Sequence, residues 1–173
     1  MMALLAPPDR PISSETEYFP RSKAEYNTMS NSNEFHFDAS DEIDQAIVKL
    51  GLARDVIYRC DEVESANIYN TARSTFVNDN PRVWWLSLKN KKRVGIYGNT
   101  QEWMQLLGQA LANHGGRCWI IPEQIGVAVY DASISIVIDL LLECSGFECN
   151  FVGSNYEWLV CDTDHSEVLL AKP

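Results

Sequence analysis

The last third of the chain, residues 118–171, constrains the fold most, because regular apolar patterning coincides there with a complete lack of positive charge. Neither Lys nor Arg occurs in it, whereas it holds nine of the 24 acidic residues. Three apolar segments near its end, at 148–152, 156–162 and 167–171, are separated by turn residues. Their spacing, with a first turn at 153–155, predicts a C-terminal three-stranded antiparallel meander.

Amphipathic patterns predict four helices, which begin at about Ser40, Asp61, Asn99 and Asp131. Asp38 or Ser40 can cap the first helix, and Gly51 ends it. Asn99 followed by Glu102 has the spacing of a capping box. Asp131 is expected to cap the fourth helix, whose apolar stripe runs through 134–142.

Five further strands are predicted, at 56–59, 82–88, 93–98, 117–122 and 126–130. The basic turn KNKK would join the second and third of them as a hairpin. On a strand, the neighbours Trp84 and Trp85 would point to opposite faces. In the meander, Tyr156, Trp158 and Val160 alternate and predict one core-facing row. The sequence therefore predicts an α+β fold: a mainly antiparallel sheet with about four helices packed on one face.

The domain organisation follows from composition. Residues 1–36 hold four of the seven prolines and a cluster of Ser and Asn, which predicts an irregular N-terminal arm. Residues 37–173 are expected to form a single domain, because a chain of 173 residues is long enough for one sizeable core.

A net charge of -10 and a pI near 4.7 argue against a nucleic-acid partner, which requires Lys and Arg at the phosphates. Acidity suits a basic protein partner, a cation, or solubility alone. The N-terminus lacks the features of a secretory signal, and no apolar run is long enough to span a membrane. Five cysteines without a framework spacing are read as reduced thiols, so we expect a cytoplasmic protein.

The loop DTDHSE, residues 162–167, is the densest polar cluster. We predict a recognition surface there, formed by Asp162, Asp164, His165 and Glu167 together with Glu157. The alternatives are a site for a hard cation, acid–base chemistry, or a solvated turn in which Asp and Ser are the usual residues. No nucleophile of defined spacing accompanies the loop, so no catalytic residue is assigned.

Cysteine ligation of a metal is the other chemistry considered. Cys144, Cys149, Cys161 and His165 are residue types that zinc accepts. Their spacing differs from that of structural zinc sites, which have tight Cys pairs, so buried apolar cysteines are expected and no metal or cofactor is assigned.

The ending SGFECNFVGSNYEWLVCDTDHSEVLLA resembles the C-terminal signature of a family of small, uncharacterised bacterial proteins of the immunity type, which neutralise a toxin by binding it. The matching positions are Tyr156, Trp158, Leu159, Asp162, Asp164, His165, Leu169 and Leu170. WWLSLK at 84–89 and CWIIPE at 118–123 are similar to the middle of that family. The family's loop typically carries two histidines, and only one is present here.

We therefore expect a non-enzymatic, acidic protein-binding module, an immunity protein that neutralises a basic toxin domain. An enzyme or metal-binding protein that uses the 162–167 loop is the first alternative. An accessory protein whose acidity serves only solubility is the second.

Overall fold

Helices and strands are interspersed along the described residues, which are 38–124, 126 and 128–173 of a computed structural model, and the last three elements are all strands. The elements are α2 (Ala39–Leu50), β1 (Ile57–Arg59), α3 (Glu62–Phe76), η1 (a 3-10 helix, Trp84–Ser87), β2 (Lys92–Ile96), α4 (Thr100–Ala112), β3 (Arg117–Pro122), β4 (Tyr130–Ser133), η2 (a 3-10 helix, Ile134–Ile136), α5 (Val137–Leu142), β5 (Cys149–Gly153), β6 (Leu159–Asp162) and β7 (Glu167–Ala171). The predicted arm at 1–36 lies outside the described residues.

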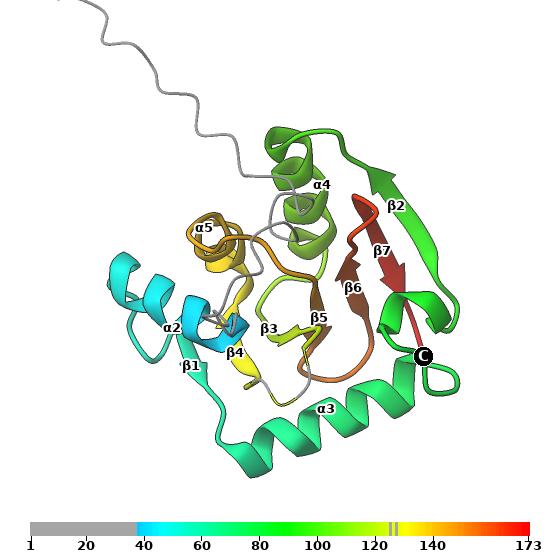
Figure 1. Cartoon of the computed structure of the whole chain (residues 1–173), viewed down its shortest axis with the longest axis horizontal. Helices are drawn as coiled ribbons and strands as arrows, with labels where there is room; N and C mark the ends of the chain where they lie inside the picture. Colours follow the sequence, from blue (N-terminus) through cyan, green and yellow to red (C-terminus); the bar gives the residue numbers. More distant parts are fainter. Residues whose placement is uncertain (1–37, 125, 127) are drawn as a thin grey trace, which may run out of the picture. The chain divides into compact units, whose positions relative to one another are not determined.

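A seven-stranded antiparallel sheet in the order β1-β4-β3-β5-β6-β7-β2 is the centre of the fold (Figure 1). The α+β prediction is confirmed, and so is the C-terminal meander, because β5 pairs with β6 and β6 with β7. Strands β1 and β2 are the two edges of the sheet. Among the described residues, no helix has both the length and the apolar character needed to cross a membrane.

Helices cover both faces of the sheet, so the prediction of a single covered face was wrong (Figure 1). On one face, Ile43 of α2 and Leu107 of α4 pack in one cluster with Phe151. On the other, Phe76 of α3 packs in a second cluster with Val152. Because Phe151 and Val152 are successive strand residues and both are fully buried, each face needs its own cover.

The predicted helix starts at Asp38 and Asn99 are confirmed. The Asp38 side chain accepts a hydrogen bond from the backbone N of Ser40 at 2.8 Å, and Asn99 accepts one from the backbone N of Glu102 at 3.0 Å. Glu102 Oε2 in turn accepts from Gly98 N at 2.6 Å, one residue earlier than in a standard capping box. Gly51 ends α2 in the left-handed conformation, as expected.

The predicted strand at 82–88 is wrong, because Trp84 begins the 3-10 helix η1. Its backbone N donates to Glu123 Oε1 at 2.7 Å, and its ring lies 5.1 Å from that of Tyr69. Backbone bonds from Asn78 to Ser87 and from Lys89 to Phe76 hold this segment against the end of α3. The predicted hairpin is therefore also absent, and β2 pairs with β7 instead.

The segment before β4 differs from the prediction in two ways. Its strand begins at Tyr130 and not at 126, because the preceding backbone N–H groups of Ala128 and Val129 bond to side chains of α2 and α3. Asp131 lies within β4 and caps no helix. Its Oδ1 accepts from Arg117 Nε at 2.5 Å across the sheet. The helical segment instead begins after Ser133 without a side-chain cap.

The predicted core row of β6 is partly wrong. Trp158 and Val160 are buried in the cluster under α2, α4 and α5. Tyr156 has a positive φ of 56° and packs on the opposite face, where its ring lies 4.6 Å from that of Trp119. The turn breaks the alternation that an extended strand would keep.

Candidate functional site

Asp162 ends β6, and its carboxylate holds two other elements onto the sheet. Oδ1 accepts a hydrogen bond from Tyr97 Oη, and Oδ2 accepts one from Trp103 Nε1, each at 2.8 Å. Burial, followed by the Asp162 carboxylate, raises the pKa of the Tyr97 hydroxyl well above its ordinary value, so Tyr97 remains a donor. Asp162 therefore joins α4 and the end of β2 to the meander.

Thr163 shapes the rest of the loop from within. Its side chain is buried, and Oγ1 lies 3.3 Å from the backbone N of both His165 and Glu167. Ser166 has a φ of 58°, and Thr163 N bonds to Glu167 O at 3.1 Å. The loop is thus a tight turn with its own hydrogen bonds.

The exposed part of the loop is Asp164 and His165. The His165 ring meets the Trp85 ring edge-on at 4.9 Å, and Asp164 N donates to Glu148 Oε1 at 3.1 Å. Glu167 is held by Arg93, whose Nη2 lies 2.5 Å from Oε1. Two of the three loop carboxylates predicted to recognise a partner, Asp162 and Glu167, are therefore engaged by residues outside the loop.

Glu157, the fifth predicted site residue, lies at the other end of β6. It is exposed on the turn between β5 and β6, whereas the 162–167 loop follows the last residue of that strand. The structure does not bring Glu157 together with Asp164 and His165.

The four residues considered as a zinc site do not converge. Cys149 packs in the cluster under α2, α4 and α5, whereas Cys161 packs in the cluster under α3. Burial raises the pKa of both thiols well above its ordinary value, which disfavours thiolate ligands. In the part of the chain that the structure describes, no group of three or more His, Cys, Asp or Glu could hold a metal ion.

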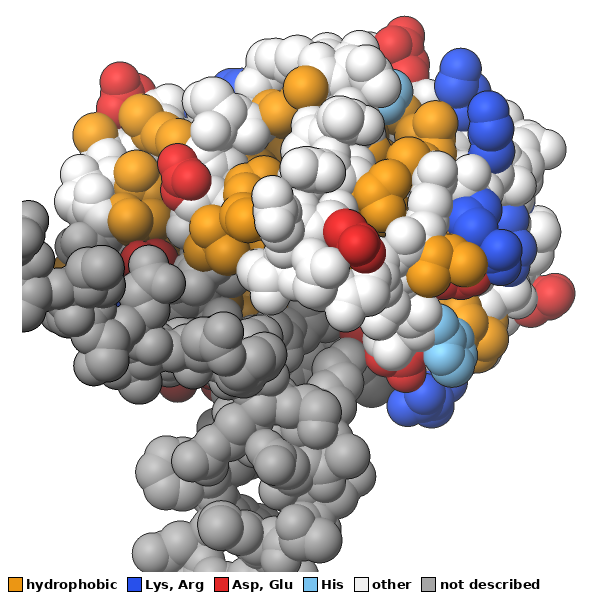
Figure 2. Space-filling view, turned by 90° about the horizontal axis from the view of Figure 1, so that it is seen from above, with side chains coloured by type: hydrophobic (Ala, Val, Ile, Leu, Met, Phe, Trp, Pro, Cys, Tyr) orange, Lys and Arg blue, Asp and Glu red, His pale blue; other side chains and the backbone are white. Residues whose placement is uncertain are grey.

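The nine acidic residues of 118–171 are not gathered into one surface. Six have hydrogen-bond or ion-pair partners elsewhere in the chain: Glu123, Asp131, Glu143, Glu148, Asp162 and Glu167. A seventh, Asp164, has its Oδ1 3.7 Å from Nε2 of the neighbouring His165. Asp139, Glu157 and Asp164 are exposed, on α5, on the turn between β5 and β6, and on the 162–167 loop. Figure 2 shows acidic side chains occurring singly over the face it presents, with Lys and Arg gathered toward one side.

A denser acidic surface surrounds β1 instead. Between residues 38 and 64 the sequence has eight acidic and three basic residues, a density that the sequence analysis overlooked beside the cation-free ending. Helix α2 brings Asp44 to Arg59 of β1, and α3 brings Glu64 to Tyr58 of the same strand. We call this surface the acidic edge: Asp41, Asp44, Asp55, Asp61, Glu62, Glu64 and Asp131. Two of these carboxylates, Asp44 and Asp131, pair with Arg59 and Arg117.

Two exposed valines lie on the acidic edge. Val48 of α2 is 80% exposed, and Val63 of α3 is 72% exposed. On α2, Asp41, Asp44 and Val48 share one helix face, since they are spaced by three and four residues. The acidic edge thus combines carboxylates with apolar side chains that folding does not bury.

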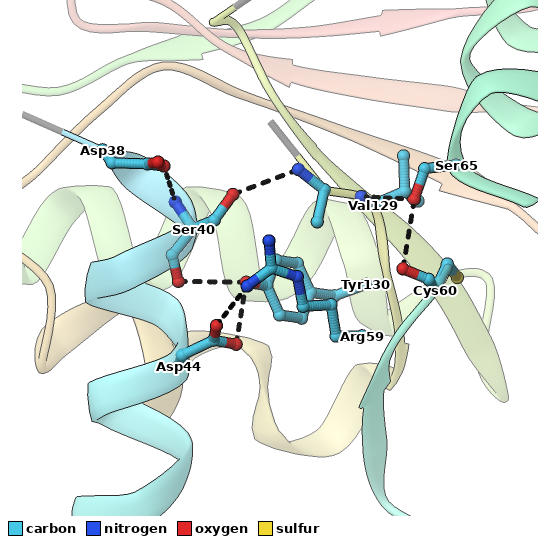
Figure 3. Close-up of polar contacts among 9 residues, drawn as sticks. Asp38, Ser40, Asp44, Arg59, Cys60, Ser65, Val129 and Tyr130 are labelled. Carbon is cyan, nitrogen blue, oxygen red and sulfur yellow. Dashed lines mark hydrogen bonds and ion pairs between the residues drawn. The ribbon is translucent and has the colours of Figure 1, made fainter. Parts of the chain in front are cut away.

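A polar network fixes the backbone beneath the acidic edge (Figure 3). Tyr130 Oη lies 3.0 Å from Ser40 O and 2.9 Å from Asp44 Oδ1. Arg59 Nη1 of β1 lies 2.5 Å from Asp44 Oδ2. Burial raises the pKa of Tyr130 above its ordinary value, and the hydrogen bond to Asp44 adds to the shift. The orientation of α2 relative to β1 is therefore set by a partly buried network of hydrogen bonds and one exposed ion pair.

Glu123 is a partly buried carboxylate on the α3 face. It accepts hydrogen bonds from Trp84 N at 2.7 Å and from Asn150 Nδ2. Burial raises its pKa above the ordinary value of 4.5, although both hydrogen bonds act in the opposite direction.

Because the folded-state pKa of Glu123 is raised, its contribution to stability is largest below pH 4.5 and is lost as pH rises through the folded-state pKa. We expect the Glu123→Gln variant to lack this decline. Urea unfolding of the parent chain and of Glu123→Gln, measured from pH 4 to pH 8, would show that the difference between their free energies of unfolding changes with pH. Glu157→Gln, at an exposed position, should follow the parent chain. Parallel curves for the parent and Glu123→Gln would contradict the prediction.

The geometry thus offers one acidic surface, at β1, and one exposed His–Asp pair, at the 162–167 loop. Comparison of the chain with protein-family models, with curated proteins and with solved structures found no match in any of the three.

Proposed function

We propose that the protein is a non-enzymatic binding module that occludes a basic protein domain, as an immunity protein does with a toxin, and that it binds through the acidic edge. The observation that carries the proposal is that two strongly exposed valines, Val48 of α2 and Val63 of α3, each have carboxylates beside them on their own helix. Carboxylates beside exposed apolar side chains fit a basic surface in both charge and contact area.

The contacts of the 162–167 loop argue against catalysis or metal binding at that loop. Asp162 and Glu167 are occupied by Tyr97, Trp103 and Arg93. A general acid or base, or a cation ligand, needs carboxylate oxygens that are available to substrate or metal. Catalysis or metal binding at the loop is therefore the less supported alternative.

Binding of a panel of purified basic toxin nuclease domains, measured by calorimetry at several salt concentrations, tests the proposal. We expect at least one domain to bind with an affinity that falls as salt rises. Asp41→Asn combined with Glu62→Gln should weaken that binding about tenfold, roughly 1.4 kcal/mol. Neither residue has a structural partner among those described, so the fold should be kept.

Asp139→Asn combined with Glu157→Gln is the matched control, since it removes the same charge from exposed positions elsewhere. It should change the affinity less than twofold. Asp164→Asn tests the loop in the same assay. If the loop variant weakens binding more than the acidic-edge variant, or if none of the domains binds, the proposal is wrong.

A further inference from the structure

A groove of about 310 Å³ lies between the last turn of α4 and the edge strand β2. Its apolar lining includes Val94 of β2, Ala110 of α4 and Leu170 of β7. At Gly95, the residue after Val94, α4 contacts the strand directly, because a Cβ there would lie 2.6 Å from Leu106 Cδ2. The groove therefore lies beside a point of direct contact between α4 and β2.

Strand β2 leaves the outer edge of the sheet open. Within the described part of the chain it pairs only with β7, and four of its five residues are exposed. Val94 is 39% exposed and Ile96 is 60% exposed. Val94 lines the groove, whereas Ile96 pairs with Glu167, which binds Arg93 on the face away from α4. The edge thus offers apolar contacts on both of its sides.

The groove is positively charged in a chain whose net charge is -10. Lys92, Arg93 and Lys172 line it. Arg93 pairs with Glu167, but no carboxylate among the described residues pairs with Lys92 or Lys172. Burial, and then the charge of Lys172, hold the pKa of the neighbouring His114 below its ordinary value. An anionic group in the groove would compensate these unpaired cations.

We propose that the groove between α4 and β2 binds an extended acidic segment of a partner protein, which adds to β2 as an eighth strand. The backbone N–H and C=O groups of an added strand would form hydrogen bonds with the open edge of β2. Its side chains would point alternately into the groove and away from it. Side chains on the groove side would contact Val94 and Leu170, and carboxylates would reach Lys92 and Lys172.

Strand β2 has features that protect a free sheet edge from unwanted pairing, and they are compatible with the addition of an acidic strand. Its register shifts between Arg93 and Gly95, and basic residues precede the shift. Such bulges and charges discourage pairing with like edges. The same positive charge attracts an acidic segment. Charge therefore favours pairing of β2 with an acidic strand over pairing with another basic edge. The groove and the acidic edge are formed by different residues, and the two proposals stand independently.

Fluorescence anisotropy of the full chain with labelled eight-residue peptides tests the inference. The probe alternates Glu with Val. A second peptide replaces every Glu with Lys, and a third replaces two Val with Pro, which removes backbone N–H donors but keeps the charge. We expect saturable binding of the Glu–Val peptide only, with slower hydrogen exchange of the β2 amides in its presence. Equal binding of the Pro peptide would rule out strand addition, and equal binding of the Lys peptide would rule out an acidic ligand.

Lys92→Gln combined with Lys172→Gln should weaken binding of the Glu–Val peptide at least tenfold. Arg54→Gln combined with Arg82→Gln removes the same charge from exposed positions outside the groove and should change affinity less than twofold. Equal losses in both variants, or no binding by the parent chain, would overturn the proposal. A concentration-dependent dimer of the chain alone, abolished by adding charge to β2, would assign the edge to a second copy instead. Toxin-domain binding through the acidic edge is measured separately, so either proposal can fail alone.

Discussion

Replacing Asp162 by alanine is expected to lower the free energy of unfolding by about 2–4 kcal/mol, because two partly buried donors lose a charged acceptor. Tyr97 Oη and Trp103 Nε1 both bond to this carboxylate at 2.8 Å. Without it, each donor must find water in a packed site or remain unsatisfied. Urea unfolding monitored by circular dichroism would measure the loss.

Two further variants make the Asp162 experiment specific. Asp162→Asn keeps one acceptor oxygen and should lose about half as much stability. Asp164→Ala, two residues along the same loop, should stay within about 0.5 kcal/mol of the parent, since its side chain is exposed. If the alanine variants at 162 and 164 unfold alike, Asp162 does not hold α4 and β2 to the sheet.

Replacing Trp158 by alanine should have the largest effect of any change considered, a loss of about 3–5 kcal/mol. The side chain is 7% exposed, and its ring stacks on that of His114 at a centroid distance of 4.2 Å and an angle of 12°. The backbone of Gly153 lies directly against the indole, where a Cβ would be 2.4 Å from Nε1. The Gly153 backbone lies on one side of the indole and the His114 imidazole on the other. These neighbours therefore have little freedom to move into the cavity that Trp158→Ala would create.

Trp85→Ala is the matched comparison for Trp158. Trp85 is only partly buried and packs at the margin of its cluster, so its loss should cost less than half as much. Thermal and urea unfolding of the two variants under one set of conditions would rank them. Equal losses would show that the stacked arrangement of Trp158 contributes nothing beyond ordinary burial.

The sequence predicted best the features that depend on neighbouring residues. Helix starts at Asp38 and Asn99, the left-handed end at Gly51 and the C-terminal meander all follow from local hydrogen bonding and alternation. Prediction failed at Trp84, where bonds to the end of α3 and to Glu123 make a 3-10 helix from a strand-like sequence. Such long-range bonds leave no local pattern.

The candidate site was harder to predict for the same reason. A cluster of Asp, His and Glu at 162–167 is conspicuous, but its availability depends on Tyr97 and Trp103, which lie 65 and 59 residues from Asp162 in the sequence. Conversely, six of the seven acidic-edge residues fall within 41–64, a density that the sequence analysis overlooked, and the pairing of β1 with β4 adds Asp131 to them. The absence of positive charge drew attention to 118–171, although its acidic residues are not gathered on one surface.

The serines that anchor the segment before β4 couple the two helical layers mechanically. Ser40 of α2 accepts from Ala128 N, and Ser65 of α3 accepts from the next amide, Val129 N. Two helices on opposite faces of the sheet therefore hold adjacent peptide groups of one strand lead-in. If either helix separates from the sheet, the short segment loses the hydrogen bond to the serine of that helix. The segment is then held less firmly against the serine of the other helix. We therefore expect local opening on one face to be transmitted to the other, so that α2, α3 and β4 exchange their amide hydrogens as one cooperative unit.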